Sequence, residues 1–460
     1  LHQVSTNPPV SVPMHAGYYV VGKQKNAAGD GYRAWIARVN LAGALDTTFG
    51  TDGWIFGNTQ DAIVDAQIVG GKAYVLGNIF AGTAAQPIVR VACYDLTTPT
   101  GSNCFAGFGG TLAFDTSSTG PRTAAYGQKL AYDSRFGLFV AARIMNTNRG
   151  QEVGIARISA DTGALITDFG GTGYNIGLPS WAGEPNAVVS VNALAVTPEG
   201  YPGGTRLYVG GQISRSTTDH DGFVLGLGPS TGATQSGWNW NVQEVWYEED
   251  DPTFRKDAVT ALTIQRNGQI VLAGWSETGD PDVSPMFLKR LNSDGSRDTS
   301  LCFGNPNRNV NGTCLVDPPY GSTFGTYKPK SVPVAVLERR QNRDLVVVQR
   351  FENHGFFLGT SDDGHVRTLV QQFSASGNRL HASRSIDFPG YPSANWSRPF
   401  AAWMGGTGLW NASENSGYGE EVLAIVGTRL YDGVDYDAAV LHLKSTDSIF
   451  ADQFGGEHGD

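Results

Sequence analysis

A short motif returns along the whole chain and limits what the chain can fold into. It reads ARVNLAGALDTTFGTDG at 37–53, ARISADTGALITDFGGTG at 156–173, KRLNSDGSRDTSLCFG at 289–304 and KSTDSIFADQFGG at 444–456. Each copy combines a strand-like segment with one or more glycine-rich turns. Because one unit is used again over the full length, the sequence predicts an array of similar units rather than several unrelated domains.

Short apolar segments recur between these motifs at intervals of about 55 to 77 residues. Such an interval accommodates about four short strands with their turns. We interpret the apolar segments as the second strand of each unit: 18–22, 73–77, 137–141, 207–211, 270–274, 345–348 and 422–427. The first strands are expected just before them, at 10–16, 65–69, 127–133, 191–197, 258–265, 331–338 and 400–404.

Four-stranded antiparallel units repeated around an axis form a β-propeller, in which neighbouring blades bury each other's apolar faces. The sequence therefore predicts an all-β fold, a seven-bladed β-propeller that forms one domain over residues 1–460. Its blades are expected near 7–57, 58–116, 117–178, 186–248, 256–318, 328–390 and 398–456. The last unit has no room for a fourth strand, so residues 1–6 are predicted to supply its outer strand and close the ring.

The composition agrees with many tight turns between short apolar strands, because the chain has 60 glycines and only 17% charged residues. A net charge of -10 argues against a nucleic-acid partner, which requires a concentrated basic surface. No apolar run is long enough to span a membrane. We expect a weakly acidic monomer and, since the chain begins at Leu1, a mature form from which a leader has been removed.

The four cysteines fall into two local pairs, Cys93 with Cys104 and Cys302 with Cys314. Each pair lies near the Phe-Gly turn of its unit, and two disulfides are predicted, each worth roughly 3 kcal/mol in the chain-entropy model. Disulfides indicate an exported protein, either periplasmic, surface-bound or extracellular. Free thiols in a cytosolic protein are the alternative, and a zinc site fits less well because neither CxxC spacing nor a suitably spaced His is present.

The run RVNLAGALDTTFGTDG resembles the delta-60 repeat, a bacterial β-propeller repeat whose consensus is similar to RLNxDGSLDTSFGxxG. The segment SDGSRDTSLCFG at 293–304 matches that consensus nearly as well. The match is good in three units and degenerate in the others. The resemblance implies a secreted or surface-associated bacterial propeller, and the family has no common activity.

Cationic residues precede or begin four of the expected first strands. If these loops open onto one mouth of the central channel, Arg122, Lys256, Lys330 and Arg398 converge there, joined by Asp65. Four cations on an acidic protein would attract an anion such as a carboxylated sugar or an acidic peptide terminus. The alternative is that each cation pairs with a nearby acid, for example Lys256 with Asp257 or Glu249.

His15 and Tyr126 lie near the same mouth and are weak candidates for a catalytic base and acid, as in a uronate lyase. The insert at 238–251 carries exposed-looking aromatics beside carboxylates, a combination used for sugar binding and glycoside hydrolysis. Burial of its tryptophans against the next blade is the favoured interpretation. No nucleotide-binding loop or serine-nucleophile motif is present.

The recurring Asp46, Asp168 and Asp298 precede the glycine turns, where a carboxylate can accept backbone N–H bonds, and a structural role is predicted for all three. Acid-rich loops elsewhere could hold a structural Ca²⁺, but none has EF-hand spacing. We therefore expect no cofactor and no metal site, and interpret these acids as solvated hairpin loops.

These observations favour an exported propeller that binds a ligand, for which an anionic sugar or peptide is the candidate, at the loop-rich mouth. The alternatives are a polysaccharide-active enzyme, either a uronate lyase or a glycoside hydrolase, and a surface adhesion or display module. Fold alone does not decide among them.

Overall fold

The computed structural model describes residues 4–5, 17–25, 32–40, 44–59, 61–79, 87–98, 101, 103–105, 110–114, 122–146, 150–178, 187–214, 220–234, 256–277, 284–301, 309–310, 313–316, 328–339, 342–354, 365–380, 384–386, 397–406, 421–431 and 435–443. Within these residues the chain is almost entirely β-strand, with one short 3-10 helix, η1 (Phe169–Gly171). No helix of this part is long and apolar enough to cross a membrane.

The strands among these described residues form seven antiparallel sheets in chain order. Sheet 1 contains β1 (Val4–Ser5), β2 (Gly17–Lys25), β3 (Tyr32–Asn40) and β4 (Trp54–Thr59). Sheet 2 contains β5 (Asp61–Val69), β6 (Lys72–Ile79), β7 (Ile88–Asp95) and β8 (Gly110–Leu112). Sheet 3 contains β9 (Arg122–Asp133), β10 (Gly137–Asn146), β11 (Gly150–Ile158) and β12 (Tyr174–Leu178).

The second half of the chain continues the pattern with some variation. Sheet 4 contains β13 (Val188–Val196), β14 (Leu207–Ser214) and β15 (His220–Leu227). Sheet 5 contains β16 (Asp257–Ile264), β17 (Ile270–Ser276), β18 (Met286–Leu291), β20 (Thr313–Val316) and the added hairpin strand β19 (Asn309–Val310). Sheet 6 contains β21 (Lys328–Glu338), β22 (Leu345–His354), β23 (His365–Phe373) and β24 (Arg384–Ile386), and sheet 7 contains β25 (Ser397–Gly406), β26 (Glu421–Tyr431) and β27 (Asp435–Leu443).

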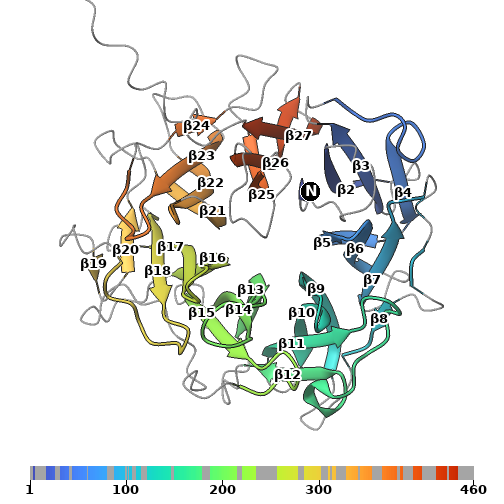
Figure 1. Cartoon of the computed structure of the whole chain (residues 1–460), viewed down its shortest axis with the longest axis horizontal. Coiled ribbons are helices and arrows are strands. Elements are labelled where there is room, and N and C mark those ends of the chain that lie inside the picture. The colour runs from blue at the N-terminus through green and yellow to red at the C-terminus, as the bar shows by residue number, and fades with distance from the viewer. Residues whose placement is uncertain are drawn as a thin grey trace, which may run out of the picture.

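Figure 1 shows the sheets standing side by side around a common centre, with the first strand of each sheet innermost. All seven segments predicted as second strands lie in β2, β6, β10, β14, β17, β22 and β26. Six of the predicted first strands lie in or largely within β5, β9, β13, β16, β21 and β25. The seventh, 10–16, lies outside the described residues, as does the insert at 238–251.

The N-terminal segment does not lie where the sequence analysis places it. Val4 pairs with Val20 and Ser5 with Tyr19, so β1 is the inner neighbour of β2 in sheet 1 and not an outer strand of sheet 7. The physical reason is that β2 needs a partner on its inner edge, and the first residues of the chain supply it. β1 also contacts β25, the first strand of sheet 7.

The apolar core is divided among the junctions between sheets. One cluster joins sheets 2 and 3 through Tyr74, Leu76, Leu130 and Leu138, and another joins sheets 3 and 4 through Phe139 and the strands of sheet 4. Comparable clusters join sheets 1 and 2, 4 and 5, 5 and 6, and 6 and 7. Each sheet thus buries apolar side chains against its neighbours, as the strand alternation predicts.

The first strands share a β-bulge at the same step of the ladder. In β5, β9, β13, β16, β21 and β25 the register skips one residue, respectively Val64, Gln128, Asn192, Thr260, Val334 and Phe400. A bulge bends its strand and re-aims the extra side chain. Two of these side chains reach the next sheet: the Gln128 Oε1 atom accepts a bond of 2.7 Å from the Val191 amide, and the Asn192 amide donates one of 2.9 Å to the Val259 carbonyl.

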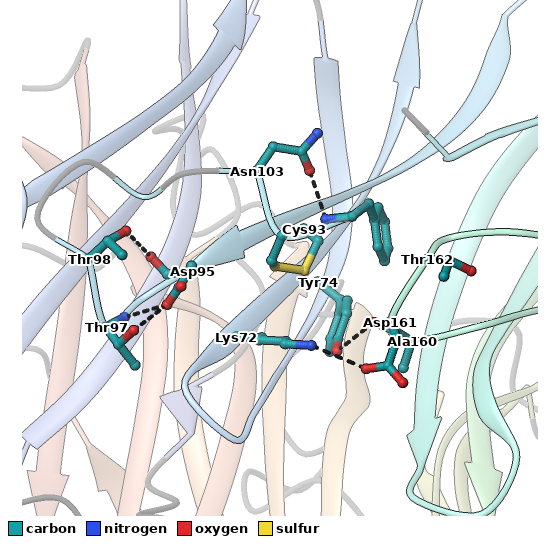
Figure 2. The surroundings of a disulfide bond; sticks show 12 residues. Lys72, Tyr74, Cys93, Asp95, Thr97, Thr98, Asn103, Ala160, Asp161 and Thr162 are labelled. Carbon is teal, nitrogen blue, oxygen red and sulfur yellow. Dashed lines mark hydrogen bonds and ion pairs between the residues drawn. A yellow bond between two sulfur atoms is a disulfide. The ribbon is translucent and has the colours of Figure 1, made fainter. Parts of the chain in front are cut away.

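The hairpin turns at the other end of the sheets are also linked across junctions. The Tyr74 hydroxyl donates to the Ala160 carbonyl at 3.0 Å, and Lys72 forms an ion pair with Asp161, as Figure 2 shows. Arg135 donates to the Thr197 carbonyl at 2.7 Å, and Arg266 donates to the Arg339 carbonyl at 2.8 Å. We call this end of the sheets the turn end.

At one equivalent position, the third strand is joined to the turn that follows it by an ion pair in some sheets and by a disulfide in another. In sheet 1 Asp46 donates its amide to the Arg38 carbonyl and accepts a 2.8 Å bond from the Arg38 guanidinium. In sheet 5 Arg290 and Asp298 repeat both interactions. In sheet 2 Cys104 donates its amide to the Cys93 carbonyl in the same way, and the two side chains form the predicted disulfide.

The second predicted disulfide is described on one side only. Cys314 in β20 is disulfide-bonded, and Cys302, the partner expected from the sequence, lies outside the described residues.

The prediction for Asp168 is wrong. The residue whose amide bonds to the Arg157 carbonyl, and which therefore corresponds to Asp46, is Ile166. The turn after β11 has one more residue than the turn after β3, so Asp168 takes the place of Thr48 and forms no side-chain cap of η1. Asp46 and Asp298 do cap their turns, accepting amide bonds from Thr48 and Ser300. Hydrogen bonds from Thr48, together with Arg38, lower the pKa of Asp46.

Replacing Arg38 and Asp46 together by cysteine should create a new disulfide, because the natural pair at the same position has a Cα separation of 5.2 Å. Mass spectrometry of the thiol-alkylated protein before and after reduction measures the outcome. Arg38→Cys alone is the control and should leave one alkylated thiol. Two free thiols in the double variant after oxidative folding would contradict the equivalence of the two positions.

Asn78→Leu should lower the free energy of unfolding by about 2 kcal/mol or more, because it leaves two buried backbone groups of Gly127 without partners. Asn78 is 6% exposed, accepts from the Gly127 amide at 2.8 Å and donates to the Gly127 carbonyl at 3.2 Å. Urea unfolding gives the measurement. Asn103→Leu, which removes one bond from an exposed residue, serves as control and should cost less than half as much.

Candidate functional site

The candidate site lies at the end of the sheets opposite the turn end. Because neighbouring strands are antiparallel, first strands begin where second strands finish and third strands begin. The first strands of successive sheets contact one another from β5 through β9, β13, β16 and β21 to β25. Their starting residues therefore lie around the centre seen in Figure 1, and we call this end the entrance end.

Lys256 precedes β16 and is held by sheet 5. Its Nζ lies 3.4 Å from the Glu277 Oε1 atom, and its carbonyl accepts a 2.8 Å bond from the Glu277 amide. It also forms a parallel bridge with His220, the first residue of β15 in the preceding sheet. The ion pair expected for this lysine is present, but its partner is Glu277 at the end of a second strand.

Lys330 lies in β21 and is placed over an aromatic ring of the preceding sheet. Its Nζ is 3.4 Å from the centroid of Trp275, the residue that ends the apolar run of β17. Ser331 donates its amide to the Ser284 carbonyl at 3.0 Å, which fixes β21 against sheet 5. Trp275 is 7% exposed and packs with Ala258 and Val332. The ammonium group is therefore positioned by a cation–π contact rather than left on a free chain.

Tyr126 lies under a guanidinium group at the same end of sheet 3. It is directly opposite Arg143 in the ladder between β9 and β10, and the Arg143 Cζ atom is 4.6 Å from the ring centroid. The Arg143 Nε atom is buried and has no hydrogen-bond acceptor among the residues that the structure describes. Tyr126 and Arg143 therefore form a second cation–aromatic pair, at a junction different from that of Lys330 and Trp275.

Asp65 is the best-bonded residue of the predicted set. Its Oδ2 atom accepts a 2.9 Å bond from the Leu130 amide of the next sheet, and its Oδ1 atom accepts one of 3.0 Å from the Ala66 amide. Burial raises the pKa of Asp65, although the charge of Lys129 and both amides act in the opposite direction. These bonds give Asp65 a role in joining sheets 2 and 3.

The remaining predicted residues are only partly placed. Arg122 begins β9 opposite Asn146, and Arg398 lies in β25 opposite Thr428, so both backbones lie at the entrance end. Their side chains and the whole of His15 lie outside the described residues. Among the described residues, no group of three or more His, Cys, Asp or Glu side chains is arranged to hold a metal ion.

Sequence reasoning missed the residues that end the second strands, above all Arg143, Trp275 and Glu277. A signal was available, because each follows an apolar run, LFVAA in β10 and IVLAG in β17. Once first and second strands are assigned as antiparallel neighbours, the end of the second strand must lie beside the start of the first.

A large pKa shift in the described part belongs to a residue away from the entrance end. Lys289 in β18 is 1% exposed, and it pairs in the ladder with Leu272 and Thr313, so their side chains share one face of sheet 5. Burial lowers the pKa of Lys289 to about 8, with a further contribution from Arg297 and an opposing one from Asp257. Leu272 belongs to the core between sheets 4 and 5, which places Lys289 in packing rather than at a ligand surface.

Lys289→Met should raise the free energy of unfolding at pH 7 by roughly 3 kcal/mol, the value that corresponds to the pKa shift. Between pH 8 and 10.5 the unfolded chain keeps a proton that the folded protein has released, so the stability of the natural protein should rise with pH across this window. The variant should lack that rise. Urea unfolding at a series of pH values tests both statements, and a parallel rise in both proteins would contradict them.

The family described as "Domain of unknown function (DUF5122) beta-propeller" matches residues 265–301, which cover the second and third strands of sheet 5 and the Arg290–Asp298 turn. The match supports a β-propeller for this unit and assigns no activity. No curated protein matches the chain in sequence.

Several solved structures align with most of the chain at low similarity. The polysaccharide lyase Uly1 is 11% identical, with a TM-score of 0.48, over 97% of this chain and 92% of its own. An ulvan lyase of family PL25 bound to -[GlcA(1-4)Rha3S]- is 10% identical, with a TM-score of 0.39, over 83% of each chain. An endo-arabinase from Bacteroides thetaiotaomicron is 10% identical, with a TM-score of 0.33, over 84% of this chain and 93% of its own. At this level the likeness decides nothing about function.

Proposed function

We propose that the protein is an exported, seven-bladed β-propeller that binds an anionic saccharide or peptide at its entrance end. The observation that carries the proposal is the placement of Lys330 over Trp275, which combines a fixed positive charge with an aromatic ring at the start of a first strand. Lys256 immediately precedes the first strand of the neighbouring sheet and adds a second cationic side chain, paired there with Glu277. Carboxylates are bound well by such charge-assisted contacts.

Closure of the ring is part of the proposal and is supported by the N-terminal strand. β1 pairs with β2 and contacts β25, so one short strand bridges the first and last sheets at the centre. The Cys93–Cys104 disulfide supports export, since such bonds persist in oxidising compartments. A closed ring leaves no apolar sheet face without a neighbour.

A polysaccharide-active enzyme, a uronate lyase or a glycoside hydrolase, is the second candidate. The observation in its favour is Tyr126, whose ring lies beside the Arg143 guanidinium at the entrance end. A tyrosine next to a cation can act in proton transfer while the cation neutralises a substrate carboxylate. A surface adhesion or display module has no described residue that specifically favours it.

Binding of an oligogalacturonate, measured by titration calorimetry, tests the proposal. We expect Lys330→Ala and Lys256→Ala each to weaken binding by roughly 10-fold, as for a charge-assisted hydrogen bond. Lys72→Ala, which removes an ion pair at the turn end, is the matched control and should leave affinity unchanged. Unsaturated products in the same samples would favour the lyase, and an absence of binding to every acidic oligosaccharide or peptide tried would refute both candidates.

A further inference from the structure

Arg143 differs from the other partly buried arginines because the described part provides it no acceptor. Arg135 bonds to Asp133 and the Thr197 carbonyl, and Arg290 bonds to Asp298. The Nε atom of Arg143 is buried and has no acceptor among the described residues, and no other hydrogen bond from its guanidinium to them is found. The Nε atoms of Arg90, Arg206 and Arg350 are buried without an acceptor in the same way, but those three residues make other interactions. Arginine stays charged in proteins, so this position carries a permanent positive charge with unused donors.

Two glutamine side chains in the strands that flank Arg143 already form hydrogen bonds to the backbone of sheet 4. Gln128 in β9 accepts from the Val191 amide, and Gln151 in β11 accepts from the Val189 amide at 3.1 Å. Arg143 lies in β10, between these two strands, and shares the face of Phe139, Ala141 and Val153 that packs on sheet 4. Each glutamine oxygen already accepts one backbone hydrogen bond, no bond from Arg143 to either is found, and Arg143 itself keeps partial exposure at the edge of this junction.

The corresponding positions of sheets 2, 4 and 5 are satisfied within the protein, whereas in sheet 6 the position is Arg350, whose Nε atom is buried without an acceptor although the residue makes another interaction. Asn78 in sheet 2 bonds to Gly127, Gln212 in sheet 4 bonds to His220, and Trp275 in sheet 5 lies under Lys330. Asn78, Gln212 and Trp275 occupy the same position of their second strands, just past the residue that lies opposite the bulge of the first strand. Three sheets thus close this position by different contacts, and sheets 3 and 6 each place an arginine there whose Nε has no acceptor among the described residues.

We propose that Arg143 is the acid-group subsite of the entrance end, binding a carboxylate or sulfate of a saccharide between sheets 3 and 4. The Tyr126 ring, 4.6 Å from the guanidinium carbon, orients the plane of the fork before the ligand arrives. A guanidinium held in one plane binds a carboxylate through two parallel N–H donors, which a lysine cannot reproduce. The inference rests on the function proposed above and names the group of the ligand that Arg143 contacts.

The test compares oligogalacturonate, its neutral methyl ester and a sulfated oligosaccharide without carboxylates by titration calorimetry. Arg143→Gln should weaken binding of at least one acidic oligosaccharide by roughly 10- to 100-fold and leave binding of the methyl ester unchanged. Arg143→Lys should recover only part of the loss. Arg343→Gln, which changes an exposed arginine at the turn end, is the matched control and should bind like the natural protein.

Thermal unfolding separates this role from a structural one. Because Arg143 has no acceptor to lose, Arg143→Gln should melt at or above the temperature of the natural protein, whereas Arg290→Gln should melt lower. A lower melting temperature for Arg143→Gln together with unchanged affinity would overturn the inference. Equal affinity of the natural protein and both Arg143 variants would refute the subsite but leave the proposed function standing. Failure of the natural protein to bind any acidic oligosaccharide would refute the saccharide-binding function and the subsite together.

Discussion

Burial between sheets is the constraint on which the rest of this structure depends. In the described part of the chain, six apolar clusters each take side chains from two successive sheets. The polar contacts follow the same rule, since Asp65, Gln128 and Asn192 each bond to the backbone of the next first strand. These links fix how far each first strand is shifted along its length relative to the neighbouring first strand. They thereby place Lys256 and Lys330 together at the entrance end.

The same position of the repeat can be fastened with different chemistry. Arg38 with Asp46 and Cys93 with Cys104 join the third strand to its turn through the same backbone bond, while Arg157 faces Ile166 and lacks the carboxylate. Arg157 instead donates to the Phe136 carbonyl and to Ser230 of the next sheet. The amide-to-carbonyl bond is therefore common to these positions. The side chains add a further interaction that differs from sheet to sheet.

Much of the fold could be predicted from the sequence because the apolar second strands are short, glycine-bounded and regularly spaced. Errors arose where one residue changes the alignment or where a terminus has two available edges. Asp168 was displaced by a longer turn, and Val4 and Ser5 joined β2 rather than the last sheet. The candidate site was harder to predict, since Arg143 and Trp275 lie at it only because their second strands pair with the first strands beside them.

The shared bulge of the first strands has a consequence for how such a chain can change over time. Insertions in loops at the entrance end leave the six bent strands untouched, so new recognition elements can accumulate there without disturbing the frame. A deletion of one residue within a first strand would reverse the inside and outside of everything beyond it. Changes in length should therefore be tolerated in the entrance-end loops and not in the first strands at the centre.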